Sequence, residues 1–279
     1  MTTYSQTITD EQIASYHESG YVESLHVLSG EEVRKYRAAL DETCEALGAH
    51  PTRLDGTHLF FRWAWELCTH RRLLDHLERL LGPNFVLKST RVFYKYANSD
   101  SYVDWHQDGI MERITLAHSP AIWLALTETT ADNGCLRVVP RSHRFLDLIP
   151  HTTHSEPPGR RPGWSRGWAV GSELSGRFTN IPPDLDPPKD IEMRPGEMSI
   201  HHPCVLHGSN ANRSDGPRIG LSASYLSSDI VNDQCPVSVM RGAPPAGVRL
   251  IEPPAAGSFE DAVAAYRSSE LQIHYGEPR

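Results

Sequence analysis

Residues 103–112 read VDWHQDGIME, a stretch that sets an imidazole and a carboxylate two residues apart, beside a large aromatic side chain. On a strand, residues i and i+2 point to the same side, so His106 and Asp108 would project together while Gln107 faces away. A neutral imidazole and one carboxylate oxygen can take two neighbouring positions on a metal ion. The pair also fits a polar turn, and a metal site would need a third ligand from elsewhere in the chain.

A second polar stretch, PGEMSIHHPCVLHGSNANRSDGPRIGLSASYL over residues 195–226, offers that ligand. It carries three candidate imidazoles, His201, His202 and His207. The Gly-Ser pair after His207 favours that residue, and we expect His202 to be a neighbour of the site rather than a ligand. Two imidazoles and one carboxylate, with three open coordination positions, are typical of non-haem Fe(II) oxygenases.

Arg218 follows His207 by 11 positions (218 − 207), which leaves room for one turn between two adjacent antiparallel strands. If it points inward from the return strand, its guanidinium can hold a carboxylate through two parallel hydrogen bonds. The competing interpretation is an ordinary surface arginine on a strand.

The segments that must position these residues change type near residue 83. Helical periodicity, capping boxes at Thr9 and Ser29 and glycine stops predict helices over residues 10–19, 30–47 and 69–82. β-branched and aromatic runs predict strands over residues 84–97, 121–130, 135–140, 197–208 and 218–227. Short strands joined by polar turns favour a mainly β fold with flanking helices, either a barrel or a double-sheet jelly roll.

We interpret residues 1–279 as a single domain. Its parts are a helical N-terminal part (1–82), a β core (83–230) and a C-terminal extension (231–279) with a short helix near 258–270. The stretch from about 151 to 190 is rich in Pro, Gly and charge, and a loop of this length inside a domain is usually a lid, a binding loop or disordered. We expect a lid that orders over substrate with Trp164, Trp168, Arg160, Arg161 and Arg166.

Composition excludes several partner classes. A formal charge of −8 argues against nonspecific nucleic-acid binding, and no apolar run approaches the roughly 20 residues that a membrane span needs. The first residues show neither the basic nor the apolar region of a signal peptide. Five scattered cysteines argue for reduced thiols. We therefore expect a cytoplasmic protein whose partner is a small-molecule substrate, with no nucleic acid and no membrane.

Taken together, HQD, then NGCLRVVPRSH, then HGSNAN and an arginine 11 positions past the histidine closely resemble the phytanoyl-CoA dioxygenase family. The resemblance runs from about residue 67 to 225 and more loosely over the N-terminal helices. It implies an Fe(II)- and 2-oxoglutarate-dependent oxygenase on a double-stranded β-helix, with O2 as the oxidant. The motifs are specific for the family and not for a substrate.

The resemblance assigns roles residue by residue. It places iron on His106, Asp108 and His207, which would be the catalytic residues. It matches Arg218 to the arginine that binds the distal carboxylate of 2-oxoglutarate. Ser209 matches a hydroxyl that reaches the same cosubstrate, and Trp123 matches an aromatic residue that packs against it.

The STRVFYK strand matches a family strand that lines the pocket. This match places Arg91, Phe93 and Lys95 on the inner face of that strand. We expect Lys95 to contact the cosubstrate, and Arg91 and Phe93 to contact the substrate.

The reaction implied is hydroxylation of an unactivated C–H bond in a small polar metabolite or natural-product intermediate of secondary metabolism, with 2-oxoglutarate converted to succinate and CO2. Asp108 argues against halogenation, because related halogenases have Ala or Gly there. Desaturation, ring closure and epoxidation use the same triad. A zinc hydrolase on the same ligands and a non-catalytic barrel that binds a ligand are two competing hypotheses. Zinc-supported activity without 2-oxoglutarate would indicate the hydrolase, and no succinate with any substrate would indicate the binding protein.

Overall fold

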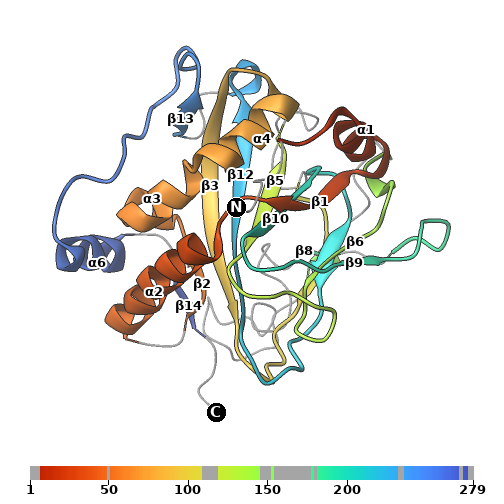
Figure 1. Cartoon of the computed structure of the whole chain (residues 1–279), viewed down its shortest axis with the longest axis horizontal. Helices are drawn as coiled ribbons and strands as arrows, with labels where there is room; N and C mark the ends of the chain where they lie inside the picture. The colour runs from red at the N-terminus through yellow and green to blue at the C-terminus, as the bar shows by residue number, and fades with distance from the viewer. Residues whose placement is uncertain are drawn as a thin grey trace.

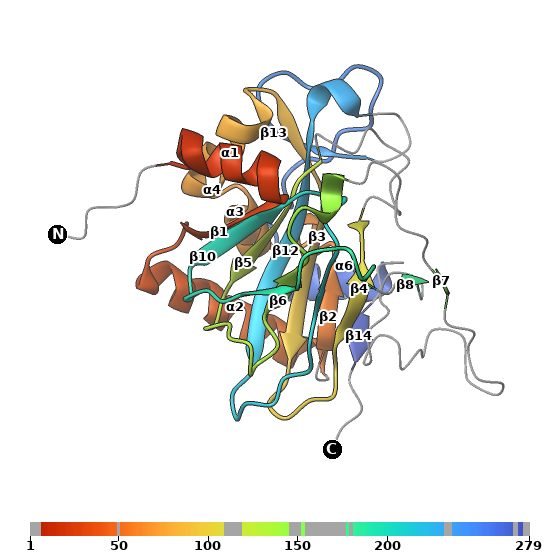
Figure 2. The same cartoon turned by 90° about the vertical axis from the view of Figure 1, so that its right-hand side faces the viewer.

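Two antiparallel β-sheets face each other, and helices cover the outer side of the larger one (Figure 1, Figure 2). The computed structural model describes residues 7–48, 51–108, 119–144, 152–153, 177–178, 181–231, 236–269 and 273–275. The two sheets form a double-stranded β-helix, or jelly roll, which confirms the predicted fold class.

The larger sheet collects strands from the whole length of the chain. Its order is β1-β10-β5-β12-β3-β2-β14, with β13 also paired to β3. The strands are β1 (Tyr21–His26), β2 (Pro51–Asp55), β3 (Phe85–Lys95), β5 (Ala121–Ala125), β10 (Glu197–His201), β12 (Arg218–Ser227), β13 (Ser238–Arg241) and β14 (Ile273–Tyr275).

The smaller sheet has the order β4-β11-β6-β9. Its strands are β4 (Val103–His106), β6 (Leu136–Val138), β9 (Lys189–Ile191) and β11 (His207–Ser209). A separate pair joins β7 (Thr152–Thr153) to β8 (Arg177–Phe178). In Figure 2, β4 of the smaller sheet lies on the side of β12 and β3 opposite helices α1 to α4.

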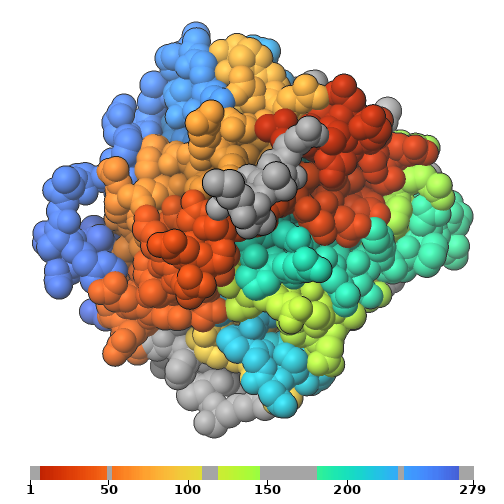
Figure 3. All heavy atoms as spheres, in the orientation of Figure 1, coloured from red at the N-terminus to blue at the C-terminus, as the bar shows by residue number. Residues whose placement is uncertain are grey.

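The helices are α1 (Asp10–Ser19), α2 (Gly30–Leu47), α3 (Arg62–Cys68), α4 (Arg71–Leu81) and α6 (Phe259–Ser268). Short 3-10 turns are η1 (Thr57–Leu59), η4 (Ser142–Arg144) and η5 (Ser228–Ile230). The capping boxes predicted at Thr9 and Ser29 are both present, and Gly20 and Gly48 end their helices in the left-handed conformation. Figure 3 shows how the N-terminal helices, in red and orange, cover much of one face of the molecule.

The main core lies between these helices and the outer face of the larger sheet. Leu40, Leu67, Leu73 and Leu77 from the helices are fully buried in one cluster with outer-face residues of the central strands, among them Ile122, Leu124, Ile200 and Leu221. Because side chains alternate along a strand, the residues between these apolar ones point toward the smaller sheet. Burial of the apolar residues on the outer face therefore fixes which residues of these strands lie on the inner face, where a site can form.

Three elements of the N-terminal part were not predicted. Two short strands, β1 and β2, join opposite ends of the larger sheet, and α3 lies between η1 and α4. Neither strand alternates polar and apolar residues cleanly, and β1 contains a register shift between Val22 and Leu25, so only pairing with β10 and β3 identifies them. The first 82 residues therefore contain strands as well as helices. Most of the predicted lid, including its Trp and Arg side chains, lies outside the described residues.

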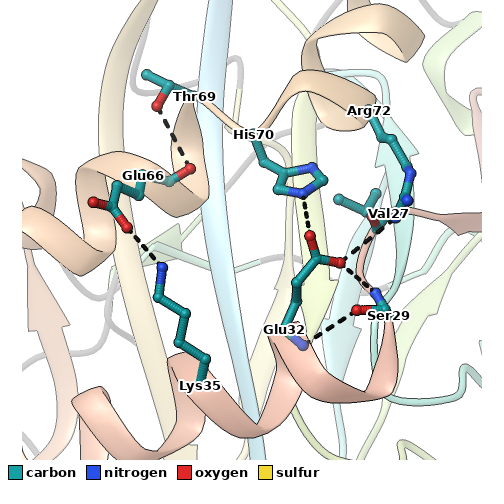
Figure 4. A network of polar contacts seen from close by, with 8 residues as sticks. All are labelled: Val27, Ser29, Glu32, Lys35, Glu66, Thr69, His70 and Arg72. Carbon is teal, nitrogen blue, oxygen red and sulfur yellow. Dashed lines mark hydrogen bonds and ion pairs between the residues drawn. The ribbon is translucent and has the colours of Figure 1, made fainter.

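The start of α2 is tied to α3 and α4 by a polar network (Figure 4). Glu32 accepts a hydrogen bond from the Ser29 amide at 2.7 Å and lies 3.2 Å from His70 Nε2 and 3.6 Å from Arg72 Nη1. Burial alone would raise the pKa of Glu32. The hydrogen bonds from Ser29 and the His70 side chain outweigh burial and lower the pKa from 4.5 to about 2.

We expect Glu32→Gln to lower the free energy of unfolding at pH 7 by about 0.5–1 kcal/mol, since a partly exposed ion pair contributes little more. Because the folded-state pKa is depressed, the carboxylate stabilises the fold fully above its ordinary pKa of 4.5, and this contribution is lost as the pH falls toward 2. Urea unfolding of both proteins at several pH values measures this. Glu31→Gln, on the exposed side of the same turn, is the control, and an equal pH dependence in both variants would contradict the assignment.

Candidate metal and cosubstrate site

The two candidate metal-binding histidines lie opposite each other on paired strands. His106 is the last residue of β4 and His207 the first of β11, and they are direct cross-strand partners. Their ring centroids are 4.0 Å apart. Gly208 permits this approach, because a Cβ there would lie 2.8 Å from the Val103 carbonyl oxygen. Strand pairing thus brings together two residues that are about a hundred positions apart in the sequence.

Backbone hydrogen bonds set the tautomer of both rings. Nδ1 of His106 lies 2.7 Å from the Asp104 carbonyl oxygen, and Nδ1 of His207 lies 2.9 Å from that of Val205. A carbonyl can only accept, so each Nδ1 carries the proton and donates. In the neutral ring the lone pair is then on Nε2, which is the arrangement that a metal-binding imidazole needs.

Asp108 completes the group just past the end of β4. Its Oδ1 lies 3.8 Å from His106 Nε2 and its Oδ2 lies 3.9 Å from His207 Nε2. One ligand atom from each residue falls within 4.8 Å of the others. Gln107 points elsewhere, as predicted, since its side-chain amide donates to the Cys204 carbonyl at 2.6 Å.

The protonation states of the group suit a cation. Burial alone would raise the pKa of Asp108, but the His201 side chain and the His207 and His106 rings hold it well below its usual range. Burial and the nearby His106 ring lower the pKa of His207 well below its ordinary value. One carboxylate and neutral imidazoles are the forms that bind a divalent metal.

The sequence predicts His202 as a neighbour of the metal site, but of the two adjacent histidines it is His201 that lines the pocket. The His202 ring packs against His143 and Tyr16, and its Nδ1 accepts a hydrogen bond from the Cys204 amide. His201, on the inner face of β10, lines the pocket instead, with Nε2 3.8 Å from Asp108 Oδ2. The reason is phase, because adjacent residues on a regular strand face opposite sides.

Arg218 begins β12 and is buried, with 3% of its surface exposed. Its Nε donates to the Gly134 carbonyl at 2.9 Å, and Nη2 donates to the same oxygen. Burial lowers the pKa of Arg218 to about 10, so the side chain is still a cation at neutral pH. Within the described residues no carboxylate lies within ion-pair distance of it. A buried cation without an anion is costly, and a bound carboxylate would remove that cost.

The indole ring of Trp123 packs against the Arg218 guanidinium. The guanidinium carbon lies 4.8 Å from the centre of the indole ring. The ring crosses β12 at Gly220, where an added Cβ would lie 2.2 Å from the nearest indole carbon. Trp123 lines the pocket, so the glycine, the indole and the arginine form one packed unit along its wall.

Ser209 lines the pocket, whereas Lys95 does not. Lys95 is buried behind the serine, and its Nζ donates to Ser209 Oγ at 2.7 Å and to the Asn210 carbonyl. Lys95 therefore reaches the pocket wall through Ser209, and its direct contact with the cosubstrate stays a prediction. Its ammonium orients the hydroxyl that faces the pocket.

The pocket beside the triad is lined by both Arg91 and Phe93, as predicted. It is also lined by His201, one of the three candidate imidazoles, and by Ser222, Leu136 and Val103, which were not predicted from the sequence. A signal for Ser222 was present, because it lies four residues past Arg218 on the same strand and therefore on the same face. No comparable signal marks Leu136 or Val103.

No helix of the described chain is long and apolar enough to cross a membrane.

A known protein family matches most of the chain. The family model "Phytanoyl-CoA dioxygenase (PhyH)" matches residues 16–220. A "Probable phytanoyl-CoA dioxygenase" of Caenorhabditis elegans is 24% identical over 254 residues, covering 80% of this chain and 77% of the relative.

Two solved structures share the fold. The non-heme monooxygenase ThoJ in its apo form has a TM-score of 0.74 at 23% identity, over 92% of this chain and 93% of its own. The epimerase SnoN, in complex with Fe3+, alpha ketoglutarate and nogalamycin RO, has a TM-score of 0.64 at 22% identity, over 89% and 96%. The match of the family model, over well more than half of the chain, establishes an oxygenase that uses iron, 2-oxoglutarate and O2. The chain belongs to the phytanoyl-CoA dioxygenase family.

Proposed function

We propose that this oxygenase hydroxylates an unactivated C–H bond of a small polar metabolite or natural-product intermediate, forming succinate and CO2. We further propose that His106, Asp108 and His207 bind the iron and that the chain is one catalytic domain. The observation that carries the proposal is the triad beside a buried arginine with no carboxylate partner among the described residues.

The donor set fits iron. Two Nε2 lone pairs and one carboxylate face a common point and leave the remaining coordination positions for cosubstrate and oxygen. When bound, iron supplies the oxidative chemistry, and the protein's residues orient the reactants and exclude water. A carboxylate at position 108 fills the position that a halide would need, so hydroxylation is favoured over halogenation.

The cosubstrate fits the Arg218 end of the pocket. We assign the distal carboxylate of 2-oxoglutarate to the Arg218 guanidinium and to the Ser209 hydroxyl, which Lys95 orients. Trp123 would pack against the cosubstrate while it fixes the arginine. On β3, the strand paired with β12, Arg91 and Phe93 would contact the substrate.

A zinc hydrolase and a non-catalytic barrel predict different sites. Neither requires a buried arginine beside the metal ligands, whereas a dicarboxylate cosubstrate does. Family membership also supports an oxygenase. Formation of succinate from 2-oxoglutarate with Fe(II), and not with zinc, tests the proposed function directly.

His207→Ala should abolish Fe(II) binding and succinate formation, because one of three ligand atoms is lost. His202→Ala should retain metal binding, since its ring faces His143 and Tyr16 instead of the pocket. Equilibrium dialysis against Fe(II) under anaerobic conditions measures both. Retained iron affinity in His207→Ala together with its loss in His202→Ala would show that the ligand assignment is wrong.

Arg218→Ala should raise the KM for 2-oxoglutarate about 30-fold or more, because truncating one partner of a desolvated charge pair costs on the order of 2–5 kcal/mol. Arg213→Ala provides the control, since that arginine is exposed and pairs with Asp100 on the surface. The KM is measured by succinate formation, and an unchanged value would refute the assignment.

Gly220→Ala should weaken 2-oxoglutarate binding indirectly, because the added methyl group meets Trp123 and not the cosubstrate. The new methyl group would displace the indole from the guanidinium, and loss of a cation–π contact corresponds to about a 3- to 30-fold higher Kd. Gly216→Ala is the matched control, because an added Cβ there meets nothing within 4 Å. Equal Kd values in wild type and Gly220→Ala would show that Trp123 does not position Arg218.

A further inference from the structure

A row of polar residues crosses the inner face of the larger sheet, where a row means residues directly opposite one another on neighbouring strands. This row joins Asp55, Arg91, Ser222, Trp123 and Ser199 on β2, β3, β12, β5 and β10. Cross-strand partners share one face of a sheet. Arg91, Ser222 and Trp123 line the pocket, so Asp55 lies at the edge of the same face.

Arg91 shares its carboxylate partner with a second arginine. Asp55 Oδ1 accepts a hydrogen bond from Arg53 Nε at 2.5 Å, and Oδ2 accepts one from Arg53 Nη2. Arg91 Nε lies farther away, at 3.7 Å from Oδ1, and makes no other polar contact with the described residues. Arg53 is therefore the closer partner of Asp55, and the Arg91 guanidinium keeps only a longer contact with that carboxylate.

The cluster is held in place from behind. The Tyr266 hydroxyl of α6 donates to the Asp55 carbonyl oxygen at 2.8 Å, and Tyr266 is 1% exposed. The Arg53 and Asp55 side chains are 8% and 16% exposed, whereas the Arg91 side chain is 32% exposed. Arg91 is thus the member of the cluster that faces the open pocket.

Arg91 stands apart from the proposed cosubstrate anchor. Its cross-strand partner Ser222 lies four residues from Arg218 on β12, about 13 Å along the strand. Phe93 and Gly220 occupy the row between them, and the indole of Trp123 fills the space above Gly220. A carboxylate held by Arg218 is therefore separated from Arg91 by aromatic side chains.

Charge balance indicates what Arg91 binds. A divalent iron, the Asp108 carboxylate, the Arg218 and Lys95 cations and the two carboxylates of 2-oxoglutarate sum to +1, so the bound cosubstrate leaves no negative charge for Arg91. The positive charge at Arg91 is left over, in a pocket whose only acidic lining residue within the described chain is Asp108. A guanidinium pairs well with a carboxylate, phosphate or sulfate group.

We propose that the substrate carries an oxyanion, a carboxylate or a phosphate or sulfate ester, and that Arg91, positioned by Asp55 and Arg53, binds this group and thereby directs the C–H bond toward the iron. This inference rests on the proposed function of the same pocket.

The first experiment measures anion binding without turnover. Anaerobic enzyme saturated with Fe(II) and 2-oxoglutarate is titrated with sodium sulfate, and separately with sodium acetate, by calorimetry at constant ionic strength. We expect one site in the wild type and at least about 10-fold weaker binding in Arg91→Gln, as expected for loss of a charge-assisted contact. The stronger of the two anions indicates which oxyanion class the site prefers.

Two further variants guard against indirect effects. Arg91→Lys keeps the charge and should retain more of the sulfate affinity than Arg91→Gln, while Arg213→Gln, on the surface, should behave as the wild type. The Kd for 2-oxoglutarate is measured in every variant. If Arg91→Gln weakens 2-oxoglutarate binding as much as Arg218→Gln does, Arg91 belongs to the cosubstrate site and the proposal is wrong.

The second experiment uses turnover. Pairs of carboxylic acids and their methyl esters are screened for stimulated succinate formation. We expect acids to stimulate more than their esters in the wild type, and this preference to disappear in Arg91→Gln. Stimulation of the wild type by methyl esters as strong as that by their acids, or equal sulfate affinity in wild type and Arg91→Gln, overturns the proposal, and absence of stimulation by both is followed by the same screen with phosphate monoesters and their neutral triesters. Failure of the wild type to form any succinate counts against the proposed function instead, because the sulfate comparison requires no turnover.

Discussion

The pairing of β4 with β11 is the constraint on which the rest of the site depends. It sets His106 opposite His207, and the backbone carbonyls of Asp104 and Val205 then fix both rings with Nε2 toward Asp108. This geometry needs a glycine at position 208, because any side chain there would meet the β4 backbone. The smaller sheet therefore supplies the proposed metal ligands through backbone geometry more than through side-chain packing.

The larger sheet supplies the basic side chains of the site, and its two faces have different roles. The outer face is apolar and packs under the helices, which stabilises strands whose inner face is partly polar. Burying Arg218 and Lys95 on that inner face carries a desolvation cost. Specific partners offset this cost: the Gly134 carbonyl and Trp123 for Arg218, and Ser209 and Asn210 for Lys95. A ligand carboxylate at Arg218 would complete this compensation, so the cosubstrate would also stabilise the folded protein.

The sequence predicts the elements and the triad because their signals are local or regularly spaced. Capping boxes mark the ends of α1 and α2, and the spacing from His207 to Arg218 reflects one turn between two strands. What the sequence could not predict depends on tertiary pairing. β1 and β2 become strands only because β10 and β3 offer them an edge, and the choice between His201 and His202 depends on the phase of β10. The hydrogen bond from Lys95 to Ser209 likewise depends on tertiary pairing, because the two residues are far apart in the sequence.

The pairing of β2 with β3 connects the N-terminal part to the proposed substrate site. β2 adds Arg53 and Asp55 to the edge of β3, directly beside Phe93 and Arg91, and α6 fixes the Asp55 backbone through Tyr266. The proposed metal ligands lie on or just after β4 and β11, and the proposed cosubstrate anchor lies on β12, whereas β2 and α6 beside Arg91 come from segments before and after these strands in the chain. Changes in β2 or α6 can therefore alter what the pocket accepts while leaving the triad and Arg218 in place.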